Sequence, residues 1–135
     1  MSMRRRFLSV SPAVHALAAA LVATSVIHLA LVPDHLREGP VLGVLFLLAG
    51  IAGLALVPAT YLNVARSRTA SAALLVALIA GYVGTRVVGY EDWDATGMWT
   101  KLVELCGLAA LWVSTQQPNG ERRVNTWAPA NRRAS

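Results

Sequence analysis

The sequence predicts an all-α integral membrane protein, an antiparallel bundle of four transmembrane helices with both termini in the cytoplasm. Three observations predict this fold class. Of the 135 residues, 56% are hydrophobic and only 14% are charged, whereas roughly 25% of a soluble protein is charged. The charges lie in short blocks between four long apolar runs, a pattern typical of chains that have lipid as their solvent. The arginines, finally, gather on one side of the predicted membrane.

Each apolar run is long enough to cross a bilayer, since a hydrocarbon core of about 30 Å needs about 20 helical residues. The predicted spans are about 11–32, 41–63, 70–89 and 98–117, within one membrane domain, 1–117. Pro33 and Pro40 bracket the first connection, and we expect them to prevent one continuous helix there. Pro58 lies inside the second span, which we expect it to kink.

The charged residues predict the orientation of these spans. One side carries nine arginines: Arg4, Arg5, Arg6, Arg66, Arg68, Arg122, Arg123, Arg132 and Arg133. The other side carries Asp34, Glu38, Glu91, Asp92 and Asp94, with Arg37 and Lys101. The positive-inside rule makes the arginine-rich side cytoplasmic, so four spans leave both termini inside. We therefore expect a multi-pass protein of the plasma (cell) membrane.

The two ends of the chain are polar. Arg4 to Leu8 is similar to a twin-arginine export signal. An inner anchor for the first span is the favoured interpretation, because three more spans follow and the small-residue matches lie within the apolar run. Residues 118–135 predict a disordered basic cytoplasmic tail. The net charge of +5 is explained by topology, and we expect no nucleic-acid partner, since no folded basic domain lies outside the spans.

Small residues at four-residue spacing predict close helix packing in lipid. The second span has Ala49 and Gly53, and the third has Ala77 and Gly81. Two interpretations stay open, packing within one bundle or a face for a second copy. The expected partners are therefore the lipid bilayer and other membrane proteins or the chain itself.

Three ionisable residues fall at similar depth in the outer leaflet, on three different spans: His28, Arg86 and Glu104. Such residues are costly within a membrane and are candidates for function. Arg86 and Glu104 lie near the shared outer end of consecutive antiparallel spans, so we predict a structural ion pair between them. His28 would then hydrogen-bond the backbone or the same glutamate.

A metal site is the alternative interpretation of this cluster. His28, His35 and Glu104 carry nitrogen and oxygen ligands that suit zinc, copper or iron. His28 and His35 are seven residues apart, so they share a helical face only if the helix continues past Pro33. His15 and His28 lie near opposite membrane faces and cannot sandwich one haem.

No catalytic residue is predicted, because the chain has no nucleophile-elbow, zinc-protease, P-loop or dinucleotide motif. Cys106 is the one cysteine, which excludes an intramolecular disulfide. The leading hypothesis is therefore a small non-enzymatic accessory or binding subunit with a polar outer-leaflet cluster and no cofactor. The alternative is a metal- or haem-handling membrane protein that serves transport or redox chemistry.

Two stretches carry a resemblance. The first runs from His28 to Pro40 and contains Pro33-Asp34-His35-Leu36, and the second runs from Gly81 to Gly89 and is followed by Trp99 and Glu104. Together they cover roughly a third of the chain and resemble a group of small, largely uncharacterised four-helix membrane proteins of high-GC actinobacteria. The resemblance implies the four-helix fold and no activity, and it draws attention again to His28, Arg86 and Glu104.

Overall fold

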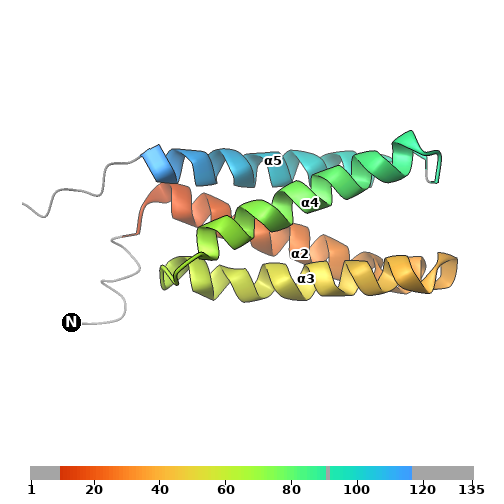
Figure 1. Ribbon diagram of the computed structural model, residues 1–135, viewed down its shortest axis with the longest axis horizontal. Helices are drawn as coiled ribbons and strands as arrows, with labels where there is room; N and C mark the ends of the chain where they lie inside the picture. The colour runs from red at the N-terminus through yellow and green to blue at the C-terminus, as the bar shows by residue number, and fades with distance from the viewer. Residues whose placement is uncertain (1–9, 91, 117–135) are drawn as a thin grey trace, which may run out of the picture.

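The computed structural model describes residues 10–90 and 92–116, and this part of the chain is helical throughout its regular structure. Its four helices lie lengthwise beside one another (Figure 1): α2 (Pro12–Glu38), α3 (Pro40–Tyr61), α4 (Ser67–Val87) and α5 (Ala95–Gln116). Three of them, α2, α3 and α4, are long and apolar enough to cross a membrane. The all-α prediction is confirmed. The export-signal-like segment, Glu91 and the predicted tail lie outside the described residues.

The first helix differs from its prediction at Pro33. α2 continues through this proline to Glu38, so the predicted end of the first span near Val32 is wrong, although the two spans are separate helices as expected. A proline inside a helix removes one backbone hydrogen bond, and membrane helices tolerate this loss where neighbouring helices pack against the affected turn. Only Gly39 separates α2 from α3, and its N–H donates to the carbonyl of His35 (2.8 Å). Pro40 then occupies the first turn of α3, where its missing N–H needs no partner.

Glycines allow α3 to approach α2 closely. Gly43, Gly50 and Gly53 are the buried glycines of α3. A Cβ atom built on Gly50 would lie 2.5 Å from Cγ of Leu29 and 3.1 Å from the carbonyl oxygen of Ser25. A Cβ on Gly53 would overlap the hydroxyl of Ser25. Close backbone approach of this kind is how helices associate in lipid, where burial of apolar surface gains little.

The helix α5 packs against α2 and α4 through one continuous face. Its buried residues follow an alternating spacing of four and three: Thr100, Glu104, Gly107, Leu111 and Ser114. Such spacing keeps one stripe of a helix against its neighbours. Leu111 joins Leu17, Leu21 and Leu75 in the buried apolar core of the described residues. The core therefore lies between α2, α4 and α5.

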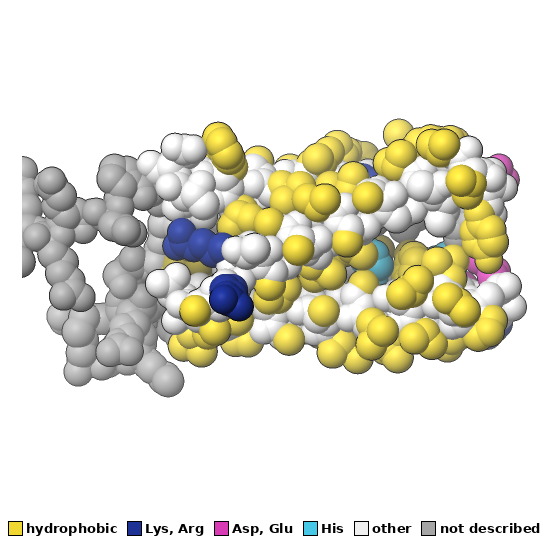
Figure 2. All heavy atoms as spheres, in the orientation of Figure 1, with side chains coloured by type: hydrophobic (Ala, Val, Ile, Leu, Met, Phe, Trp, Pro, Cys, Tyr) yellow, Lys and Arg dark blue, Asp and Glu magenta, His cyan; other side chains and the backbone are white. Residues whose placement is uncertain are grey.

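In contrast, α4 packs less closely than the other helices: it contacts α3 and α5 to the same small extent, whereas α3 packs extensively on α2. The side that α3 and α4 present is mostly apolar and has a hollow between them (Figure 2). Basic side chains lie near one end of this side and acidic side chains at the other. Arg66 and Arg68 belong to the basic end at the α3–α4 link, and Asp34 and Glu38 belong to the opposite end of the bundle.

Candidate binding site

A fully buried carboxylate occupies the interface of α2, α4 and α5. Glu104 is 0% exposed and accepts hydrogen bonds from Nζ of Lys101, at 2.7 Å to Oε1 and 2.6 Å to Oε2. The hydroxyl of Thr24, on α2, donates to Oε1 over 2.9 Å. Lys101 gives its remaining donor to the carbonyl of Leu78 on α4, over 3.1 Å. An ammonium group has three donors, so this lysine is satisfied and the buried pair is electrically neutral.

Arg86 lies one layer closer to the acidic end of the bundle. Its Nη2 donates to Oδ1 of Asp94 (3.1 Å), and its Nη1 donates to the hydroxyl of Thr85 (3.0 Å). The guanidinium carbon also lies 3.9 Å from the ring centroid of Tyr82, a cation–π contact. Asp94 accepts the backbone N–H of Gly97 as well (2.9 Å), so the same carboxylate caps the first turn of α5.

The structure thus gives Arg86 and Glu104 different partners from those predicted. Each belongs to a separate ion pair, Arg86 with Asp94 and Glu104 with Lys101. The reason is the register of the helices. Leu78, whose carbonyl contacts Lys101, precedes Arg86 by eight residues, roughly 12 Å of helix. Lys101 is also one helical turn from Glu104 on the same face, so it reaches the carboxylate first.

His28 lies beside the carboxylate network and is 5% exposed. Its Nδ1 lies 2.8 Å from the carbonyl oxygen of Thr24, and its ring centroid lies 4.9 Å from that of Phe46. Because α2 continues past Pro33, His35 lies on the same side of the helix and contacts the same ring, with a centroid distance of 4.0 Å. The two histidines therefore share one face of α2, and both pack against Phe46.

The described residues contain no group of three or more histidine, cysteine, aspartate or glutamate side chains positioned to hold one metal ion. Nδ1 of His35 contacts Glu38 (3.1 Å), and Glu104 is occupied by Lys101 and Thr24. His15 precedes His28 by thirteen residues and instead contacts the hydroxyl of Tyr61 (2.9 Å). The predicted metal or haem site thus stays a prediction to which this geometry adds no support.

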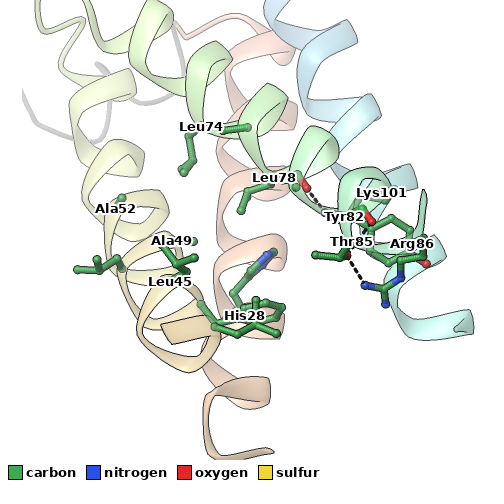
Figure 3. Close-up of a pocket in the computed structure, with 15 residues that line it drawn as sticks. His28, Leu45, Ala49, Ala52, Leu74, Leu78, Tyr82, Thr85, Arg86 and Lys101 are labelled. Carbon is green, nitrogen blue, oxygen red and sulfur yellow. Dashed lines mark hydrogen bonds between the residues drawn. The ribbon is translucent and has the colours of Figure 1, made fainter. Parts of the chain in front are cut away.

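Two cavities meet at the polar cluster. The apolar cavity, of about 470 Å³, lies between α3 and α4 and has His28 of α2 at its floor (Figure 3). Its walls are mainly aliphatic, including Leu45, Ala49, Leu74 and Leu78. The polar cavity, of about 250 Å³, lies toward the acidic end. Five residues line both cavities and separate one from the other: His28, Phe46, Tyr82, Arg86 and Lys101.

Sequence reasoning missed Lys101, Thr24 and Tyr82. Lys101 was grouped with the charges of the outer loop, yet its side chain is only 13% exposed. Its spacing of three residues from Glu104 was the available signal, since residues three apart are neighbours on a helix. Thr24 and Tyr82 carried no charge to mark them, and only the packing of α2 and α4 on α5 reveals their role.

The comparisons with known proteins add no relative. Among protein-family models, curated proteins and solved structures, none matches the chain. We therefore infer function from the cavity and the side chains around it.

Proposed function

We propose that this chain is a small non-enzymatic membrane protein that binds a lipid-soluble molecule in the apolar cavity. The observation that carries the proposal is the cavity itself, an aliphatic chamber of about 470 Å³ with a polar cluster at one end. This volume lies within the range of about 300–1,000 Å³ of small-molecule pockets, which combine apolar walls with a few polar groups that orient the ligand.

The position of the cavity favours a ligand that arrives from the bilayer. It lies between α3 and α4, two helices that carry exposed apolar residues such as Leu48, Ile51 and Val76. In a membrane these residues would face lipid, so the opening between the helices would face lipid as well. An accessory or binding subunit of this kind takes its ligand sideways from the hydrocarbon phase.

The proposal includes four spans, with α5 as the fourth. Both charges of α5 point inward and neutralise each other. Large apolar side chains are exposed along its length, namely Met98, Trp99, Leu102, Leu105, Trp112 and Val113. Twenty-two residues of helix extend for roughly 33 Å, enough for a bilayer core. We propose that α5 crosses a plasma membrane with the other helices, so both termini lie on the cytoplasmic side.

Gly81 and Gly84 provide a matched test of the cavity. Both lie on α4, and a Cβ atom at either position meets no atom within 4 Å. Only Gly81 lines the apolar cavity. Gly81→Leu should therefore fill the cavity without a clash, whereas Gly84→Leu should leave it open.

The measurement is mass spectrometry of organic-solvent extracts from the purified full chain. We expect a lipid-soluble compound in near-stoichiometric amount with the parent and with Gly84→Leu, and a loss of most of it with Gly81→Leu. Equal amounts in all three proteins, or none in the parent, would contradict the proposed function.

A further inference from the structure

We infer that the molecule bound in the apolar cavity carries a hydroxyl group, which donates a hydrogen bond to Nε2 of His28. The inference rests on the proposed function and specifies the chemical class of its ligand. It begins from the contact between Nδ1 of His28 and the carbonyl of Thr24 (2.8 Å). A carbonyl can only accept, so Nδ1 carries the proton, and in a neutral ring Nε2 then presents a lone pair.

This lone pair has no hydrogen-bond partner among the described residues, because the contacts of the His28 side chain with Thr24 are made through Nδ1. The side chain is nonetheless 95% buried and lines both cavities. In Figure 3 it points from α2 into the space between α3 and α4. Nε2 thus opens onto the cavity without a donor from the described part of the chain, so a ligand that supplies a donor in these apolar surroundings gains affinity there.

The two cations at the end of the cavity do not favour an anionic ligand. All three donors of Lys101 are directed at Glu104 and at the carbonyl of Leu78. The Nη groups of Arg86 donate to Asp94 and Thr85. Two positive charges thus face two carboxylates, and the cluster is balanced before any ligand binds. An anionic ligand therefore meets no net positive charge in this cluster, whereas a hydroxyl needs only the lone pair of His28.

The inference is tested with probes that differ in a single donor hydrogen. Nonylphenol and its methyl ether, nonylanisole, have the same apolar body, and only the phenol can donate. We expect the full chain in phosphatidylcholine nanodiscs to bind the phenol about five- to tenfold more tightly than the ether, the worth of one hydrogen bond. Dodecanol, tested against its own methyl ether, shows whether an aliphatic hydroxyl serves as well as an aromatic one.

Two variants assign the preference to His28. His28→Phe keeps a ring against Phe46 and removes the acceptor, so phenol and ether should bind equally. His28→Gln supplies an amide oxygen of comparable reach and should retain part of the preference. Circular dichroism and gel filtration establish that each variant is folded. Should His28→Phe fail to fold, His28→Leu removes the acceptor in its place, and a phenol preference that persists in His28→Leu would overturn the inference.

The outcomes separate this inference from the proposed function. Equal binding of phenol and ether by the parent, with both weakened by Gly81→Leu, overturns the hydroxyl contact and supports the cavity. Tighter binding of dodecyl phosphate than of dodecanol also overturns it, in favour of an anion. If no probe binds in a way that Gly81→Leu weakens, both the cavity function and the hydroxyl contact are wrong.

Discussion

Lys101 is the single residue on which the buried cluster most depends. Its ammonium group contacts both oxygens of Glu104, a side chain with no solvent exposure. A buried ion pair of this type adds little stability compared with an apolar pair of the same shape. Removal of one partner is different, because it leaves an uncompensated charge in a medium of low dielectric constant.

We therefore expect Lys101→Met to destabilise the folded protein by about 3–5 kcal/mol, the usual range for a broken buried pair. Lys101→Met combined with Glu104→Met should recover much of that loss. The measurement is thermal or denaturant unfolding in detergent, analysed as a double-mutant cycle. If the two single losses simply add, the residues are not coupled, and the contact described above is wrong.

Arg86→Met serves as the control for that experiment. Arg86 pairs with Asp94 and lies over Tyr82, so its loss should couple weakly to a change at Glu104. Strong coupling of Arg86 to Glu104 would instead favour the ion pair that the sequence predicted. The depth of a residue in a membrane can be read from its distance to the end of an apolar run. The register of one helix against its neighbour cannot be read in this way, and that register, with the three-residue spacing of Lys101 from Glu104, decided which cation contacts Glu104.

At the scale of the helices, the contact of α2 with α3 depends on residues that lack a side chain. Gly50→Ala places a methyl group against Leu29 and the backbone of Ser25, and should destabilise the protein by about 1–3 kcal/mol. Gly84→Ala, where no atom lies within 4 Å, should be neutral or stabilise by up to about 1 kcal/mol, since alanine favours the helix. Unfolding measurements on both variants compare the two sites directly. Equal effects would mean that α2 and α3 are not in close contact.

The presence of four helices could be predicted from hydropathy, because each helix corresponds to one of the four long apolar runs of the sequence. The residues at which the helices begin and end were predicted less accurately. The first helix was expected to end near Val32 and extends to Glu38, because Pro33 is accommodated within it. The fourth begins at Ala95, about one turn before its predicted start, because Asp94 caps it. Sequence-based rules state that a proline disfavours the interior of a helix. Whether the helix nonetheless continues through the proline depends on the packing of neighbouring helices.

At the scale of the whole molecule, the separation of charge predicts the orientation in the membrane. The α3–α4 link carries Arg66, and the α4–α5 link carries Asp92 and Asp94. In a Cys106→Ala background, Asp92→Cys should react with a membrane-impermeant thiol reagent on intact cells. Ala65→Cys should react only after the cells are permeabilised. Both positions are exposed in the structure, so burial does not explain a difference between them.

The reverse labelling pattern would invert the proposed orientation, and labelling of both positions on intact cells would contradict an odd number of crossings between them. Asp92 is preferable to Asp94 for this purpose, because Asp94 also holds Arg86 and the first turn of α5. Ala65 is preferable to Ser67, which is buried.

The partners of α5 imply an order of assembly. Its charged pair depends on Thr24 of α2 and on the Leu78 carbonyl of α4, and both precede α5 in the chain. In the proposed membrane arrangement, the three more apolar helices enter the bilayer before α5 leaves the ribosome, because synthesis proceeds from the N-terminus. The last helix then meets a surface that already offers hydrogen bonds to its lysine and glutamate. In that proposed arrangement the earlier helices guide the insertion of α5, and a change at Thr24 alters the surroundings of a carboxylate eighty residues later in the chain.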